Sequence, residues 1–167
     1  MLKIINNLKP FFEDCYKEMG VREYSRVMKI TPPTASKLLK KYFSKGLLKK
    51  RLDRNYLLFA VNQQSKTMRD LSRIYWRNKL DKLIKYLESF FPKAIILFGS
   101  LSKLETRKNS DVDIILLGFF KKKINLKKFE KELKREIQVF QYDCLDNVNK
   151  GLRLNAINGY ILRGYVS

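Results

Sequence analysis

The stretch AIILFGSLSKLETRKNSDVDIILLG, residues 94–118, decides the fold of the second half of the chain. It opens with five apolar residues, which are typical of a buried strand, and continues directly into Gly99 and Ser100. Eleven residues after Ser100 stands Asp111, followed by Asp113 and a second apolar run. Two apolar strands joined by a polar segment predict an α/β domain in which both acids lie at the start of the second strand.

The types and spacing of these residues indicate chemistry on phosphates. Asp111 and Asp113 are two positions apart, so a strand places both carboxylates on one face. Two carboxylates that lie close together repel unless a cation lies between them, and Mg²⁺ prefers oxygen ligands of this kind. Gly99 lets the backbone approach a phosphate, and Ser100 offers a hydroxyl and an amide at the start of the following helix. The combination predicts metal-assisted attack by an acceptor hydroxyl on a triphosphate.

This pattern resembles the signature of the minimal nucleotidyltransferases of the DNA polymerase β superfamily, and the resemblance extends over about 75–166. It implies a mixed sheet flanked by helices. It also implies Mg²⁺-dependent transfer of a nucleotidyl group from an NTP to a hydroxyl on a protein, an RNA or a small molecule. The residues that the resemblance implies are Asp111 and Asp113 as catalytic groups and metal ligands, and Gly99, Ser100, Lys103 and Ser110 as nucleotide-binding residues.

Two positions depart from the family pattern. Leu104 stands where the family commonly has glycine, which predicts a loop of different shape. Gln138 falls where a later strand usually carries a third carboxylate, and a glutamine amide can neither take a proton nor bring charge to a metal. Three explanations stay open. Glu136 or Asp143 substitutes through a shifted strand register, the acceptor is activated differently, or the domain binds nucleotide without turnover.

The first half has the pattern of helices followed by a hairpin. A turn over Thr31–Thr34 precedes a helix over Thr34–Phe43, and two short strands follow over 47–52 and 56–61. This is the order of a winged helix-turn-helix, in which the second helix of the pair enters the major groove of DNA. The stretch 31–62 resembles MarR-like winged-helix domains, although such a domain used only for protein contact has the same pattern. The residues expected to contact DNA are Thr34, Ser36, Lys37, Lys40 and Lys41 from the helix, and Lys50, Arg51 and Arg54 from the hairpin.

A broad apolar stripe over residues 65–91 predicts one long connecting helix. Trp76, near its middle, is expected to couple the two halves and to pack a homodimer. The chain is therefore expected to be an α/β (α+β) protein in three parts. These are a winged helix-turn-helix over 1–64, the connecting helix over 65–91 and a minimal nucleotidyltransferase domain over 92–167.

The composition of the chain indicates which classes of partner it can bind and excludes histidine-dependent active sites. The 36 lysines and arginines against 16 aspartates and glutamates give a net charge of +20, which favours polyanions such as NTP or DNA, although a solvated lysine-rich surface gives the same number. The longest apolar run, Ile114–Phe120, is too short to span a bilayer, and the N-terminus lacks a signal-peptide pattern. We therefore expect no membrane association and a cytoplasmic location. The absence of histidine excludes a Ser-His-Asp triad and any His-ligated zinc site.

Two functions follow from these patterns. The first is a Mg²⁺-dependent nucleotidyltransferase with a DNA-binding winged helix, and the whole chain resembles the archaeal proteins that fuse these two domains. Some minimal nucleotidyltransferases pair with a HEPN-type toxin and modify it, so the resemblance also implies an antitoxin-like role and a protein partner. The alternative is a DNA-binding transcriptional regulator with a catalytically degenerate, nucleotide-sensing domain. The spacing of the glycine, serine and acids favours the enzyme, and Gln138 favours the alternative.

Overall fold

The computed structural model describes residues 2–118 and 123–166. These residues form two compact units, and neither unit is one continuous stretch of chain. The boundary at Ser72 falls inside a helix, and a five-residue segment of the second half folds with the first unit. The first unit is Met1–Ser72 with Leu104–Lys108, and the second is Arg73–Lys103 with Asn109–Ser167.

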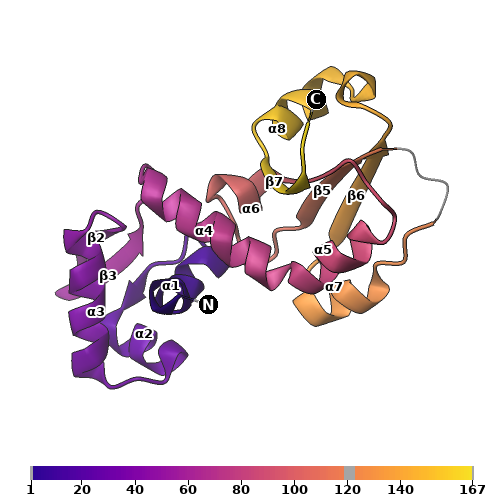
Figure 1. The fold of residues 1–167 in the computed structure, drawn as a ribbon. Helices are drawn as coiled ribbons and strands as arrows, with labels where there is room; N and C mark the ends of the chain where they lie inside the picture. The colour runs from indigo at the N-terminus through magenta and orange to yellow at the C-terminus, as the bar shows by residue number, and fades with distance from the viewer. Residues whose placement is uncertain (1, 119–122, 167) are drawn as a thin grey trace. The chain divides into compact units, whose positions relative to one another are not determined.

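The elements of the first unit are, in chain order, α1 (Lys3–Glu13), β1 (Met19–Gly20), α2 (Val21–Met28), α3 (Pro32–Ser44), β2 (Leu48–Asp53), β3 (Tyr56–Val61) and the first part of α4 (Lys66–Lys79). The strands form an antiparallel sheet in the order β1-β3-β2. Figure 1 shows β2 and β3 of this sheet next to α3. β2 and β3 are the two strands of a hairpin, in which Asp53 pairs with Tyr56 next to the turn. The sequence predicts both hairpin strands to within one residue, but it does not predict β1.

The core of the first unit forms where the apolar faces of its helices meet. α1 buries Ile5, Leu8 and Phe11, which recur at helical spacing. Tyr24 of α2 stacks against Phe11, with ring centroids 5.9 Å apart, and its hydroxyl donates to the Asn7 carbonyl at 2.8 Å. Each fully buried side chain of this size contributes about 1.5–3 kcal/mol through removal from water. The apolar face of α1 therefore packs against α2 in the core of the first unit.

The predicted single helix over 65–91 is wrong, because the structure divides it at Leu80. α4 ends at Lys79, and α5 (Asp81–Glu88) begins two residues later. Leu80 has φ −90° and ψ 3°, outside the helical range, yet its side chain is buried. The negative charge of Asp81 in the first turn of α5 suits the helix dipole there. The sequence predicts one helix because the apolar stripe continues through Leu80 across the break.

The remaining elements of the second unit are β4 (Ala94–Phe98), α6 (Gly99–Lys103), β5 (Val112–Leu117), α7 (Lys127–Leu133), β6 (Ile137–Tyr142), the 3-10 helix Leu145–Asn147, α8 (Lys150–Ile157) and β7 (Tyr160–Gly164). The strands form a mixed sheet in the order β6-β5-β4-β7. β4 pairs antiparallel with β5 and with β7, whereas β5 pairs parallel with β6. The mixed sheet predicted for this half of the chain is therefore present.

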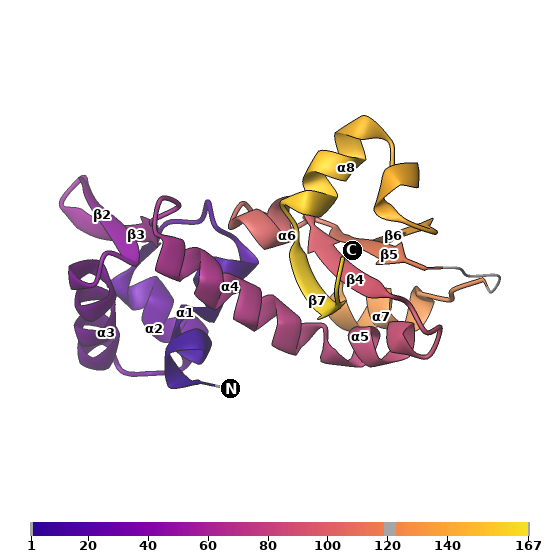
Figure 2. The same cartoon turned by 45° about the horizontal axis from the view of Figure 1, so that its top comes forward.

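Helices cover both faces of this sheet. α5 and α7 lie on one face and α8 on the other (Figure 2). On the α8 face, Ile96 and Phe98 of β4 pack with Ile115 of β5 and Ala156 of α8. Asp113 pairs with Phe98 and lies two residues before Ile115, so its side chain is on the α8 face too. No helix among the described residues is both long enough and apolar enough to cross a membrane.

Candidate active site

The turn between β4 and α6 brings the backbone directly against an acidic side chain. Gly99 has φ +68°, a left-handed conformation that residues with a Cβ adopt only at a cost. A Cβ built on Gly99 would lie 2.3 Å from Oδ2 of Asp113, closer than any real Cβ contact. In the sheet, Asp113 pairs with Phe98, the residue just before the turn. Glycine at position 99 is therefore required by both the backbone conformation and the Asp113 carboxylate.

Asp111 and Asp113 lie on either side of the first residue of β5. Val112 is fully buried, whereas both acids are only half-buried. Burial raises the pKa of Asp113 above its ordinary value, and the nearby charge of Asp111 raises this pKa further. Two like charges held this close favour the binding of a cation between them.

Gln138 occupies the place beside the two acids in the sheet. β5 and β6 pair without a shift, so Asp113 lies opposite Gln138, and Nε2 of Gln138 donates a hydrogen bond to Oδ2 of Asp111 at 3.0 Å. Glu136 is exposed and precedes β6, and Asp143 follows the other end of the strand. The explanation by a shifted register is therefore wrong, because the amide of Gln138 stands where a shift would bring a carboxylate.

Hydrogen bonds within the short helix α6, and one from α6 to α8, fix the position of this helix. The hydroxyl of Ser102 donates to the Gly99 carbonyl at 3.0 Å, which fixes the turn. Lys103 donates from Nζ to Oδ1 of Asn155 in α8 at 3.0 Å, so its ammonium group has a fixed place on the α8 face. Ser100, next to Gly99, is half-buried, as is Ser110, which precedes Asp111.

Leu104 adopts the backbone conformation that glycine favours. Its φ is +65°, although it has a Cβ, and its side chain is fully buried. A left-handed conformation costs a non-glycine residue roughly 1–2 kcal/mol. Burial of the leucine side chain offsets this cost with about 1.5–3 kcal/mol. Leucine at position 104 therefore buries a side chain that glycine does not have.

A known protein family matches the part of the chain that contains all of these site residues. Residues 81–162 match the family described as Polymerase beta, Nucleotidyltransferase, and this range includes Gly99, both acids and Gln138. The second unit carries a nucleotidyltransferase domain. The matched range contains the glycine turn, the two acids and the amide of Gln138 that donates to Asp111.

Solved structures are similar to about half of the chain. A toxin–antitoxin crystal structure with AMP-PNP is 26% identical, with a TM-score of 0.40, over 53% of this chain and 73% of its own. A mutant of the toxin–antitoxin MntA-HpeT is 24% identical, with a TM-score of 0.38, over 51% of this chain and 72% of its own. The DNA-binding protein Sso10a-2 from Sulfolobus solfataricus is 14% identical, with a TM-score of 0.35, over 55% of this chain and 86% of its own. No curated protein sequence matches the chain.

The nucleotidyltransferase domain also contains a buried arginine that the sequence does not predict. Arg135 stands two residues before β6, and its Nη1 donates to the carbonyl of Ser110 at 2.5 Å. Its guanidinium lies over the ring of Trp76, 5.2 Å from the centroid. No sequence signal separates Arg135 from the other basic residues, because the chain has 36 lysines and arginines.

The predicted DNA-binding residues all belong to the first unit. Lys37, Lys40 and Lys41 are exposed on α3, and within the described residues none of the three has an ion-pair partner. Lys50 of β2 lies over the ring of Phe43 in α3, with Nζ 4.4 Å from the centroid. Of the others, Thr34 and Arg54 are exposed and Ser36 is half-buried.

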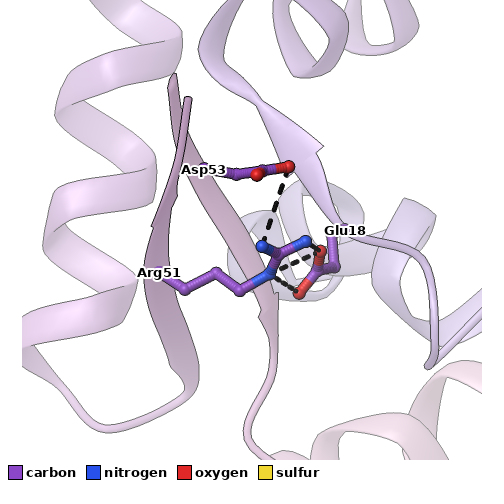
Figure 3. Close-up of polar contacts among 3 residues, drawn as sticks. All are labelled: Glu18, Arg51 and Asp53. Atoms are coloured by element: carbon purple, nitrogen blue, oxygen red, sulfur yellow. Dashed lines mark hydrogen bonds and ion pairs between the residues drawn. The ribbon is translucent and has the colours of Figure 1, made fainter. Parts of the chain in front are cut away.

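Arg51 differs from the other cations of this surface because two carboxylates already bind it. Its Nε donates to both carboxylate oxygens of Glu18, at 2.7 and 2.9 Å, and its Nη2 contacts Glu18 as well (Figure 3). Its Nη1 lies 3.7 Å from Oδ2 of Asp53. The hydrogen bonds from Arg51 hold the pKa of Glu18 below its usual value. A phosphate would have to compete with both acids for this guanidinium.

Proposed function

We propose that the second unit transfers a nucleotidyl group from an NTP to an acceptor hydroxyl, with Mg²⁺ held by Asp111 and Asp113. The observation that carries this proposal is the apposition of Gly99 and Asp113. Because glycine has no Cβ, the turn approaches the Asp113 carboxylate closely, and a phosphate bound by the backbone of the turn would lie beside this carboxylate. A carboxylate pair in a merely structural role would not need a glycine in a left-handed conformation against it.

The two acids suit a Mg²⁺ ion that shares its ligands with the substrate. Mg²⁺ keeps several waters and binds through one or two carboxylates together with substrate phosphates. The described residues contain no cluster of three or more metal-ligating histidine, cysteine, aspartate or glutamate side chains. Asp111 and Asp113 would therefore hold the ion together with triphosphate oxygens. When bound, the ion would supply positive charge to the phosphate oxygens on which negative charge develops.

The protein's own groups would then orient the reactants. In the proposed reaction the acceptor oxygen forms a bond to the α-phosphorus, the bond from this phosphorus to the bridging oxygen breaks, and pyrophosphate leaves. Gly99 and Ser100 would bind phosphate oxygens through the backbone and the hydroxyl, with Lys103 and Ser110 beside them. Gln138 has no basic atom, so the proton of the acceptor passes to an aspartate or to water.

Calorimetric titration with each NTP, with and without Mg²⁺, tests this proposal. We expect the wild type to bind an NTP only with Mg²⁺, and Asp111→Asn to weaken this binding by roughly tenfold or more, since ligand charge sets metal affinity. Asp143→Asn is the matched control, because Asp143 is exposed and follows the far end of β6. Wild-type protein that binds no NTP under either condition would contradict the proposal.

For the first unit we propose binding to DNA through α3 and the hairpin of β2 and β3. The observation that favours it is the row of exposed lysines on α3, none of which has an ion-pair partner in the described residues. Cations on a helix and on an adjoining hairpin suit the phosphates on either side of a groove, and the short hydroxyls of the same helix suit base edges. The order of α2, α3 and the hairpin supports the predicted winged helix-turn-helix, in which α3 would enter the major groove.

The salt dependence of DNA binding should separate the lysines from Arg51. Each phosphate contact contributes roughly 0.9 to the slope of log affinity against log salt. We expect Lys37→Ala to reduce the slope by about this amount. Arg51→Ala should change it less, because Glu18 and Asp53 already neutralise Arg51. Lys9→Ala, an exposed lysine on α1, is the control. An unchanged slope for Lys37→Ala would instead favour a first unit used for protein contact.

Three further properties stay predictions from the sequence. They are an antitoxin-like role with a toxin-like protein as acceptor, a homodimer and a cytoplasmic location. The alternative function, a DNA-binding regulator that only senses nucleotide, shares both proposed binding surfaces with the enzyme. Release of pyrophosphate from a bound NTP separates the two, because only the enzyme breaks the bond to the α-phosphorus.

A further inference from the structure

Three hydrogen bonds join the segment that carries Asp111 to β6 and to the two residues before it. Arg135 donates to the carbonyl of Ser110 at 2.5 Å, and the amide of Val112 donates to the carbonyl of Glu136 at 2.9 Å. Gln138 donates to the carboxylate of Asp111 at 3.0 Å. The bonds of Arg135 and of Val112 fix the backbone on both sides of Asp111, and the bond from Gln138 fixes its side chain.

Arg135 is an unusual choice for a structural bond. Its side chain is almost wholly buried, with 7% of the residue exposed, and burying a guanidinium costs free energy unless its partners compensate. The arginine places a fixed positive charge at the carbonyl that adjoins Asp111, in a site with two negative carboxylates.

The other side of Arg135 is covered by Trp76. The ring of Trp76 is fully buried, and its Nε1 has no hydrogen-bond partner among the described residues, which costs free energy. Arg135 and Lys79 both lie over this ring, with Cζ at 5.2 Å and Nζ at 4.9 Å from ring centroids. Trp76 thus contacts both cations through the face of its ring, which is the geometry of a cation–π interaction. Trp76 therefore packs against the guanidinium that donates to the carbonyl of Ser110.

We propose that Arg135, held by Trp76, is a positioning residue that orients Asp111 for metal binding, and that Trp76 reports on this site. The inference rests on the proposed function of the second unit. Arg135 acts through the backbone of Ser110 and contacts no substrate. Residues that orient a metal ligand typically change metal affinity by about 10- to 100-fold when they are replaced.

Metal affinity and tryptophan fluorescence test the proposal without a measurement of turnover. Trp76 is the single tryptophan of the chain, so its emission is unambiguous. In the wild type we expect Mg²⁺ with NTP to change the emission of Trp76, and Asp111→Asn to abolish this change. Arg135→Met should raise the dissociation constant for Mg²⁺ by roughly 10-fold or more, whereas Arg135→Lys should recover part of the affinity. High Mg²⁺ should restore NTP binding to Arg135→Met, which it would not do for an unfolded protein.

Arg163→Met is the matched control, because Arg163 is an exposed arginine of the same unit that pairs with Glu88 at 2.7 Å. It should leave Mg²⁺ affinity and Trp76 emission unchanged. If Arg135→Met does not fold, Arg135→Gln keeps an N–H donor without the charge, and weaker Mg²⁺ binding by this variant supports the proposal. Unchanged Mg²⁺ affinity in a folded Arg135→Met or Arg135→Gln protein would overturn it. Wild-type protein that binds no Mg²⁺ with NTP would overturn the proposed function itself.

Discussion

Gly99→Ala is expected to lower nucleotidyl transfer by roughly 100-fold or more, because a displacement of about 1 Å at the reacting groups costs this much. The new Cβ would lie 2.3 Å from Oδ2 of Asp113, so either the turn or the carboxylate must move. The left-handed φ of +68° adds a backbone cost of about 1–2 kcal/mol. Single-turnover release of pyrophosphate at saturating Mg²⁺ and NTP measures the loss of transfer.

Gly46→Ala is the matched control for this substitution. Gly46 has the same φ of +68°, and a Cβ built on it would meet no atom within 4 Å. Both variants therefore share the cost of the left-handed backbone, and only Gly99→Ala has the contact with Asp113. We expect Gly99→Ala to lose about 1–3 kcal/mol more free energy of unfolding than Gly46→Ala, and Asp113→Ala to recover this excess. Equal losses in the two variants would contradict the contact.

Gln138→Glu is expected to raise nucleotidyl transfer by about 100-fold, the lower end of the contribution of a positioned general base. The introduced carboxylate would lie opposite Asp113 in the sheet and within reach of Asp111, where Gln138 now donates its amide. It would accept the proton of the acceptor hydroxyl, which Gln138 cannot do. The pyrophosphate assay measures this gain.

The same substitution has a second consequence, which needs no acceptor. Without metal, three carboxylates on one face repel, and the hydrogen bond to Asp111 is lost. Gln138→Glu should therefore lower the midpoint of thermal unfolding without Mg²⁺ and increase the rise in this midpoint that Mg²⁺ gives. Gln141→Glu, at an exposed position of the same strand, is the control and should show neither effect. Slower transfer by Gln138→Glu than by the wild type would show that the amide itself orients Asp111 for the reaction.

The sequence predicts this half of the fold well where one local pattern determines the structure. The apolar runs before Gly99 and after Asp113 become β4 and β5, because uninterrupted apolar runs of this length are typical of strands covered on both faces. Gln138 is predicted at the place of a third carboxylate, and the unshifted pairing of β5 and β6 puts it beside Asp113. These features depend on spacing along the chain, which a sequence displays directly.

The features that the sequence does not predict depend on contacts between distant segments. The bond from Arg135 to Ser110 spans 25 positions, and the pair of Arg51 with Glu18 spans 33. A lysine-rich chain offers many cations and gives no sign of which ones find such partners. The sequence does not predict the break at Leu80 for the opposite reason, since the apolar stripe is continuous there and only the backbone conformation changes.

The segment Leu104–Lys108 has a consequence for how this chain could have been inherited. The segment lies between Lys103 and Asn109 of the second unit, yet it completes the first unit. There the amide of Cys15 donates to the carbonyl of Thr106 at 2.7 Å, and the Arg107 guanidinium lies over Tyr16, 4.0 Å from the ring centroid. A recombination event at Ser72 would separate the first unit from its own segment Leu104–Lys108 and would join it to a segment from another chain. Exchange of either unit among relatives therefore requires that the segment and its docking surface change together.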